Sequence, residues 1–265
     1  MVLHTGNYIS LCSGIGGLDL GVKAAFPNAR CVCYVERESF AASVLVARME
    51  DSSLDKAPVW SDLTTFDCAP WRGSVDFVVA GFPCQPVSVA GRRKGEGDER
   101  WIWEHVIRVV REVGCRYVFL ENVAGLLSMG CGRVLGDLAQ SGFDAEYMCI
   151  QASDVGAPHK RSRWFCLGKL DDTDIAGLEG WREHQSSCER VVRKTGDEMV
   201  NSSESIFPPQ PGSELWRHVA DEAQPAICGV AHGTSERLDR LRALGNGVVP
   251  LQAAVALREL SRRLR

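Results

Sequence analysis

Short runs of β-branched and aromatic residues recur along the chain and predict the strands of a buried sheet. These runs cover residues 8–12, 31–35, 75–80, 117–120, 147–152 and 164–167, with a weaker one at 59–60. Between them, apolar positions at helical spacing predict helices that end at Phe26 or cover residues 39–49, 101–113, 133–140 and 251–264. Strands that alternate with helices favour an α/β fold.

A cysteine follows one of these strands directly. The run at 75–80 continues into Gly81-Phe82-Pro83-Cys84-Gln85-Pro86, which places a thiol at the carboxyl end of the strand, where open α/β sheets bind ligands. The two prolines restrict the backbone around Cys84, so we expect its sulfur to point in a defined direction. The alternative is that Cys84 is a small buried hydrophobic residue, the usual state of a free cysteine.

Acidic residues follow three other strands. Glu36 could accept both hydroxyls of a ribose, or carry the negative charge favoured at the start of the next helix. Asp62, followed by Leu63, could accept a hydrogen bond from an adenine amino group or belong to a surface turn. Glu121 opens the segment Glu-Asn-Val at 121–123. A carboxyl group held there against apolar residues has a raised pKa, which suits a proton donor near neutral pH.

A glycine-rich turn at residues 13–21 joins the first predicted strand to a helix. Its glycines would let the backbone approach a ligand at the helix N-terminus. The position of the third glycine of a dinucleotide-binding motif is occupied by Asp19, which disfavours a pyrophosphate site. A glycine turn without any ligand is the alternative.

Two basic segments are candidates for binding anions. Residues 88–100 contain three glycines and four basic side chains, which suits a loop that closes over a phosphate backbone, or else an ordinary surface loop. Arg161 and Arg163 stand two positions apart, so strand alternation places them on one face. There they could clamp a carboxylate, phosphate or carbonyl group, or form the basic edge of an exposed strand.

The composition indicates one large globular domain, or one domain with a small lobe, because 45% of the 265 residues are hydrophobic and 24% are charged. No segment reaches the roughly 20 apolar residues that span a bilayer. The N-terminus lacks a secretory-signal pattern, so we expect neither membrane insertion nor export. The eleven cysteines form no Cys-x-x-Cys pair or zinc-type cluster, which predicts a reduced, cytoplasmic protein without a structural metal.

Charge is distributed unevenly. The net charge of −4 argues weakly against nucleic acid, but residues 236–265 carry seven arginines against three acidic residues, and local patches decide such binding. Residues 169–235 are polar with few periodic apolar positions, which predicts a small irregular lobe. We therefore expect a main domain at 1–168, this lobe, and a C-terminal segment at 236–265 whose helix packs back on the main domain.

Three motifs in this order closely resemble those of the DNA (cytosine-5) methyltransferases: Gly-Phe-Pro-Cys-Gln at 81–85, Glu-Asn-Val at 121–123 and Gly-Asn-Gly-Val at 245–248. The resemblance covers about residues 8–167 and 241–257. It implies a Rossmann-like S-adenosylmethionine-dependent methyltransferase domain, with helices on both faces of a mixed, mostly parallel sheet, and a target-recognition lobe. It also implies methyl transfer from S-adenosyl-L-methionine to C5 of a flipped-out cytosine in double-stranded DNA, through a covalent Cys84 adduct at C6.

By this resemblance, Cys84 is the nucleophile, Glu121 the proton donor, and Arg161 and Arg163 support them. The implied cofactor-binding residues are Ser13, Gly14, Ile15, Gly16, Gly17, Glu36, Arg37, Asp62, Leu63, Pro83, Trp103, Asn246 and Val248. The implied DNA-binding residues are Gln85, Ser88, Arg92, Arg93 and Lys94. Together with the small size, the resemblance suggests a monomer of prokaryotic or phage origin that acts on DNA in the cytoplasm, without a metal or a membrane.

The sequence departs from the family pattern at Ser10 and Cys12, where the family often has Asp and Phe, and at His159, which replaces a Gln. The family's arginine-bearing helix before the Gly-Asn turn is not recognisable, and the lobe is short, so the target sequence is left open. A tRNA cytosine-5 methyltransferase is the nearest alternative, but its Cys-Phe-Thr segment is lacking. A nicotinamide-dependent oxidoreductase or an inactive nucleic-acid-binding module would leave Cys84 and Glu121 without a role.

Overall fold

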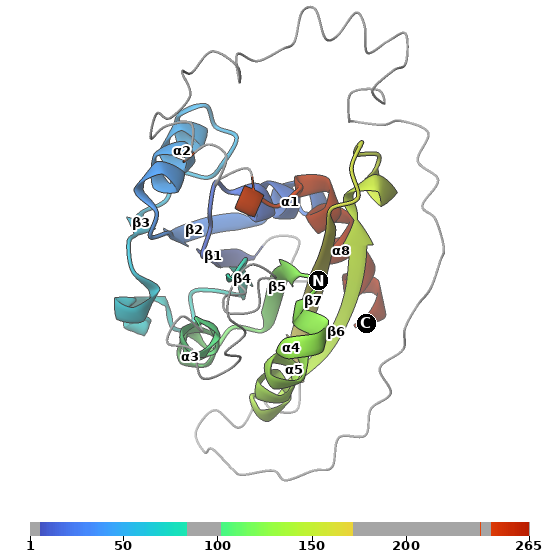
Figure 1. Ribbon diagram of the computed structural model, residues 1–265. Coiled ribbons are helices and arrows are strands. Elements are labelled where there is room, and N and C mark those ends of the chain that lie inside the picture. Colours follow the sequence, from blue (N-terminus) through green and yellow to red (C-terminus); the bar gives the residue numbers. More distant parts are fainter. Residues whose placement is uncertain (1–5, 84–101, 172–238, 240–244, 265) are drawn as a thin grey trace, which may run out of the picture.

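The computed structural model describes residues 6–83, 102–171, 239 and 245–264. At its centre is a seven-stranded sheet with the strand order β3-β2-β1-β4-β5-β7-β6 (Figure 1). The strands are β1 (Asn7–Leu11), β2 (Arg30–Val35), β3 (Val59–Trp60), β4 (Phe77–Ala80), β5 (Tyr117–Val123), β6 (Phe143–Gln151) and β7 (Ser162–Leu170). Strands β1 to β5 pair in parallel and β7 pairs antiparallel with both its neighbours. The predicted mixed, mostly parallel sheet is therefore confirmed.

Helices cover both faces of the sheet (Figure 1). They are α1 (Gly17–Ala25), α2 (Ser39–Glu50), α3 (Trp103–Val113), α4 (Leu126–Met129), α5 (Cys131–Gln140) and α8 (Pro250–Arg263). Residues of α1, α2 and α8 share one apolar core, and residues of α3 and α5 share the other. Strand β4 contributes Phe77 and Val79 to the first core and Val78 and Ala80 to the second. Its uninterrupted apolar sequence follows from burial on both sides.

Three strands extend beyond their apolar runs. Strand β5 continues through residues 121–123, and β6 and β7 form a hairpin nine residues long on each side. Pairing of β7 with both β5 and β6 maintains the ladder through polar positions that carry no hydrophobic signal. The predicted domain boundary at 168/169 falls inside β7, and only residues 169–171 of the predicted lobe are among those described.

The C-terminal helix packs against the first helix, as the sequence predicts. A Cβ atom added to Gly21 of α1 would lie 2.5 Å from the Cβ of Ala253 and 2.7 Å from the carbonyl oxygen of Pro250, both in α8. Arg258 also donates a hydrogen bond to the carbonyl oxygen of Ala24, 2.6 Å away. Glycine at position 21 thus permits the close approach of two helices that are more than 200 residues apart in the chain.

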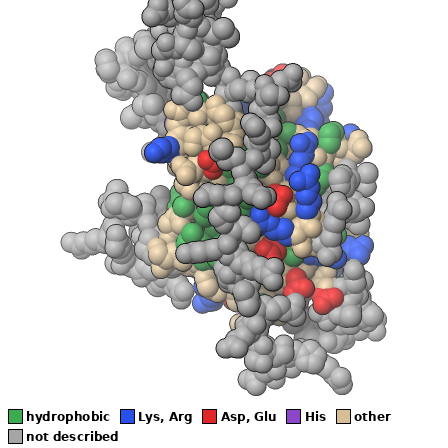
Figure 2. Space-filling view, turned by 90° about the vertical axis from the view of Figure 1, so that its right-hand side faces the viewer, with side chains coloured by type: hydrophobic (Ala, Val, Ile, Leu, Met, Phe, Trp, Pro, Cys, Tyr) green, Lys and Arg blue, Asp and Glu red, His purple; other side chains and the backbone are tan. Residues whose placement is uncertain are grey.

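The described surface carries charges of both signs. On the face that lies to the right in Figure 1, Lys and Arg side chains occur beside Asp and Glu side chains (Figure 2). Among the helices in the described part of the chain, none is long and apolar enough to cross a bilayer.

The close contact at Gly21 predicts a marked difference between two glycine substitutions. Gly21→Ala should lower the free energy of unfolding by about 1–3 kcal/mol, because the added methyl group overpacks the contact between α1 and α8. Gly136→Ala is the matched control, since a Cβ at this position of α5 meets nothing within 4 Å. It should raise the free energy of unfolding by about 0.5–1 kcal/mol through helix propensity. Urea unfolding of both variants measures the difference, and equal effects would contradict the packing described.

Candidate active site

Glu121 lies near the end of β5 and is 6% exposed. Its Oε1 atom is 2.9 Å from Nε of Arg163 on the neighbouring strand β7, whose side chain is also largely buried. Burial raises the pKa of Glu121 to about 7, against the opposing effect of the positive charges on Arg163 and Arg161. The direction agrees with the sequence-based expectation, and the carboxyl group can hold a proton near neutral pH.

The turn that leads to Cys84 rests against the same strand. Asn122 donates a hydrogen bond from Nδ2 to the carbonyl oxygen of Phe82, 2.9 Å away, and its Oδ1 accepts one from the N–H of Val123. A Cβ on Gly81 would lie 3.5 Å from Oε2 of Glu121. The acid is therefore adjacent to the segment that ends at Pro83, the residue before Cys84. The anchoring role of Asn122 was not foreseen, because no sequence pattern links it to Phe82.

Six of the predicted site residues lie outside the described residues: Cys84, Gln85, Ser88, Arg92, Arg93 and Lys94. Their roles as nucleophile and DNA contacts stay predictions. The structure establishes that Gly81 lies beside Glu121 and that Phe82 is hydrogen-bonded to Asn122, which places the turn before Cys84 next to the acid.

The glycine turn after β1 and the carboxylate after β2 are joined directly. The N–H of Gly14 donates to Oε2 of Glu36 at 2.6 Å, and the N–H of Glu38 donates to Oε1 at 2.8 Å. Gly14 and Gly16 both have positive φ, at 55° and 79°, which glycine adopts without strain. Glu36 thus supports both the turn and the start of α2, while each carboxylate oxygen keeps a second lone pair for a ligand.

Other residues of the turn are firmly placed. The N–H of Ser13 donates to the carbonyl oxygen of Val35 at 3.1 Å. Arg48 of α2 donates to the carbonyl oxygen of Ile15. A Cβ on Gly17 would lie 2.5 Å from the carbonyl oxygen of Val248. The N-terminal glycine turn therefore touches the C-terminal Gly-Asn-Gly-Val segment, as expected if both line one pocket.

Asp62 and Leu63 begin a short 3₁₀ helix, Leu63–Thr65. Oδ1 of Asp62 accepts hydrogen bonds from the backbone N–H and the hydroxyl of Thr64, and these bonds lower the pKa of Asp62. Leu63 is buried, and its carbonyl oxygen accepts a hydrogen bond from Arg108 of α3. Asp62 thus caps this helix with Oδ1, and its role toward a cofactor stays a prediction.

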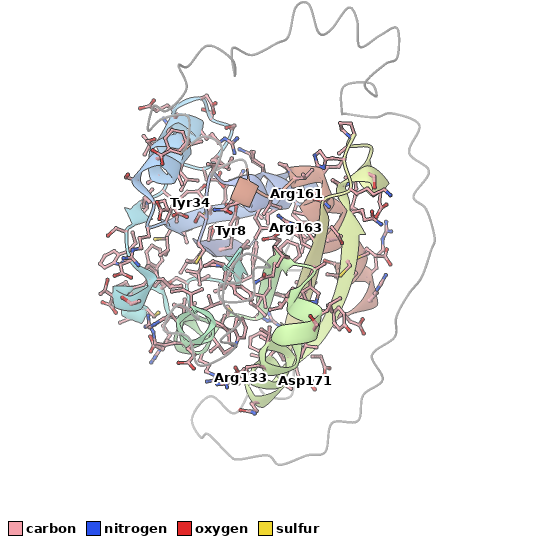
Figure 3. All side chains as sticks on the ribbon, viewed as in Figure 1. Tyr8, Tyr34, Arg133, Arg161, Arg163 and Asp171 are labelled. Carbon is pink, nitrogen blue, oxygen red and sulfur yellow. The ribbon has the colours of Figure 1, made fainter. Side chains whose placement is uncertain are left out.

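Trp103 and Arg161 have hydrogen-bond partners that the sequence does not indicate. Trp103 is fully buried, packs on Phe82 with ring centroids 5.2 Å apart, and donates its indole N–H to Asp137 of α5 at 2.8 Å. Arg161 and Arg163 lie together at the start of β7 (Figure 3) but have different partners. Its Nη2 atom donates to the carbonyl oxygens of Gly245 and Gly247 instead of to a carboxylate.

These elements define a class of protein. A glycine turn after β1, a carboxylate after β2 and a buried acid near the end of β5 lie along one edge of a mostly parallel sheet, where α/β proteins bind nucleotide-like cofactors. The chain belongs to the C-5 cytosine-specific DNA methylase family, whose model matches residues 6–220. A nicotinamide-dependent oxidoreductase is thereby disfavoured.

Individual relatives agree with this assignment. The chain is 34% identical over 173 residues to the type II methyltransferase M.NlaX of Neisseria lactamica, covering 63% of this chain and 53% of the relative. It is 32% identical over 167 residues to the type II methyltransferase M.CviJI of Paramecium bursaria Chlorella virus IL3A, covering 62% and 43%. The chain spans about half the length of these curated relatives.

A solved structure of a mutant DNMT2 from Spodoptera frugiperda superimposes with a TM-score of 0.61, covering 97% of this chain and 100% of that one. At 16% identity this likeness shows the fold alone.

The raised pKa of Glu121 predicts a pH-dependent contribution to stability. The folded protein holds the proton more tightly than the unfolded chain, so the contribution is complete below pH about 4.5 and is lost as the pH rises through about 7. Relative to Glu121→Gln, the free energy of unfolding of the wild type should fall by about 3 kcal/mol between pH 4 and pH 8. Urea unfolding across this range measures the difference between the two proteins. A difference that does not change with pH would contradict the assigned pKa.

Proposed function

We propose that this protein transfers a methyl group from S-adenosyl-L-methionine to C5 of a flipped-out cytosine in double-stranded DNA. The single observation that carries the proposal is the buried Glu121, with a pKa of about 7, held by Arg163 against the turn that leads to Cys84. An acid that is partly protonated near pH 7, next to the turn that leads to Cys84, suits the proton donor that cytosine-5 chemistry needs, and Cys84 is the proposed nucleophile.

In the proposed reaction, Sγ of Cys84 forms a bond to C6 of the cytosine. Electrons of the C5–C6 double bond shift through the ring to N3, which takes a proton from neutral Glu121. The activated C5 would then take the methyl group as the bond between that group and the sulfonium sulfur breaks, leaving S-adenosylhomocysteine. C5 then loses its proton to a base. Cleavage of the C6–S bond restores the double bond and returns the thiolate, while the proton on N3 returns to Glu121. Arg163 keeps the carboxyl group oriented throughout.

The residues present suit the proposed cofactor. S-adenosyl-L-methionine, when bound, supplies the electrophilic methyl group. The carboxylate of Glu36 has lone pairs available for ribose hydroxyls, and a Cβ on Gly14 would meet nothing within 4 Å, so the turn leaves space for a ligand beside it. Oδ2 of Asp62 is the proposed acceptor for the adenine amino group. Asn246 is exposed at the turn that contacts the glycine segment.

The base must leave the duplex to reach a buried acid, because C5 and C6 are stacked and shielded within DNA. Extrusion costs a few kcal/mol. We propose that Gln85, Ser88, Arg92, Arg93 and Lys94 offset this cost through contacts to the DNA. We further propose that the protein acts as a monomer, without a metal, in the cytoplasm of a prokaryote or of a phage-infected cell. The bacterial and viral relatives described above support this origin.

The nucleophile can be tested with a matched pair of cysteine variants. Wild-type protein should transfer tritiated methyl groups from S-adenosyl-L-methionine to duplex DNA and not to tRNA. Cys84→Ser should abolish transfer, because a hydroxyl is a much weaker nucleophile than a thiolate. Cys149→Ser is the control, since Cys149 is an exposed free cysteine on β6. Undiminished turnover in Cys84→Ser would refute Cys84 as the nucleophile. Labelling of tRNA but not of DNA would show that the protein is a tRNA methyltransferase instead.

Loss of the acid Glu121 should slow the chemical step more than it weakens DNA binding. Glu121→Gln keeps the shape of the side chain and an acceptor for Arg163 but cannot donate the proton of a carboxylic acid. Its kcat should fall by about 100-fold or more, with little change in KM for DNA. Steady-state kinetics on the same duplex separate the two parameters, and a change confined to KM would exclude the role of Glu121 as acid.

Bisulfite sequencing of DNA from expressing cells would identify the methylated sequence.

A further inference from the structure

Arg161 binds both carbonyl groups that flank Asn246. From a single nitrogen, Nη2, it donates hydrogen bonds to the carbonyl oxygens of Gly245 and Gly247, each 2.6 Å away. The two bonds fix the peptide group that precedes Asn246 and the peptide group between Gly247 and Val248. Charged donors make the stronger class of hydrogen bond, so these two bonds help to hold residues 245–247, the first two of which are helical, in place.

The backbone of Arg161 is fixed independently. Its carbonyl oxygen accepts hydrogen bonds from Nε2 of Gln252, at 2.8 Å, and from the N–H of Ala152, at 3.1 Å. Gln252 is fully buried in α8, and its Nε2 also donates to the carbonyl oxygen of Ile150. Arg161 therefore connects the β6–β7 hairpin to both the C-terminal turn and the helix that follows this turn.

The positive charge of Arg161 also lowers the pKa of Glu121. Arg161 and Arg163 lie beside each other (Figure 3), and of the two it is Arg163, opposite Val123 of β5, that forms an ion pair with Glu121. Among the described residues, these two arginines are the charged groups that lower the pKa of Glu121, against the effect of burial. In turn, burial and the charge of Arg163 lower the pKa of Arg161.

We propose that Arg161 is a positioning residue that shapes the 245–247 turn for cofactor binding by hydrogen bonds and separately tunes the acid Glu121 by its charge. This inference rests on the proposed function and adds a link within the site: one side chain joins the cofactor turn to the proton donor. The two roles depend on different properties of the guanidinium group, so they can be separated by substitution.

Two substitutions separate them. Arg161→Lys keeps the positive charge but lacks the length and planar geometry needed to reach both carbonyl oxygens. Arg161→Met removes the charge and the donors. Arg111→Met is the control, because Arg111 of α3 also links two elements, by hydrogen bonds to the hydroxyl of Ser141 at 2.9 Å and to the carbonyl oxygen of Asp137 at 3.5 Å. Circular dichroism and thermal melting establish that each variant is folded.

Binding of S-adenosylhomocysteine, measured by calorimetry without DNA, tests the first role. The dissociation constant should rise about 10- to 100-fold in both Arg161→Lys and Arg161→Met, corresponding to the loss of one or two charge-assisted hydrogen bonds. It should be unchanged in Arg111→Met. Wild-type affinity in Arg161→Lys would overturn the role of the hydrogen bonds.

The pH dependence of kcat tests the second role. Activity requires the protonated acid, so kcat falls as the pH rises through the pKa of Glu121. Loss of a nearby positive charge raises this pKa, so the fall in Arg161→Met should occur about one pH unit higher than in the wild type. In Arg161→Lys, which keeps the charge, kcat should fall at the same pH as in the wild type. An identical profile in Arg161→Met would overturn the electrostatic role, and Arg161→Gln replaces that variant if it does not fold.

The experiment distinguishes failure of this inference from failure of the proposed function. A wild-type protein that binds no S-adenosylhomocysteine would overturn both. A wild-type protein that binds it and methylates DNA, with Arg161 variants that match it in affinity and pH profile, would overturn the role of Arg161 alone.

Discussion

The candidate site depends on the ion pair between Glu121 and Arg163, and this pair depends on the register of β5 against β7. Glu121 lies opposite Phe165, and Arg163 lies opposite Val123, so the two charged residues are diagonal neighbours on one face of the sheet. Diagonal positions are within reach of long side chains. A slip of one residue would move Arg163 to the opposite face and leave the buried carboxyl group without a partner.

Burial gives the carboxyl group its chemical character. Removal of Glu121 from water disfavours its charged form, and the nearby arginines limit this effect, so that the pKa settles at about 7. If the arginines outweighed the effect of burial, Glu121 would stay ionised at neutral pH and could not donate a proton. Without the arginines, its pKa would be higher still and it would hold its proton too tightly. The balance between desolvation and two positive charges therefore suits Glu121 both to give up a proton and to take it back.

Contacts between distant segments assemble the rest of the site. Gly17 can meet the backbone of Val248 only because it lacks a side chain, and Asn122 holds the carbonyl group of Phe82 next to the acid. Arg161 connects the hairpin of β6 and β7 to the C-terminal turn. Close packing and hydrogen bonds therefore join the glycine turn after β1, the end of β5 and residues 245–248, although these segments come from both ends of the chain.

Sequence patterns located most strands and helices and the polar residues that follow the strands, and the three motifs indicated the cytosine-5 methylase family, which the family model confirms. These features are local: periodicity, prolines and strand ends are visible within a few neighbouring residues. Three-dimensional packing alone brings Arg163 to Glu121, Arg161 to glycine carbonyl groups and the indole N–H of Trp103 to Asp137. Each of these partners is distant in sequence, and which donor meets which acceptor depends on strand register and helix packing, which no local pattern encodes.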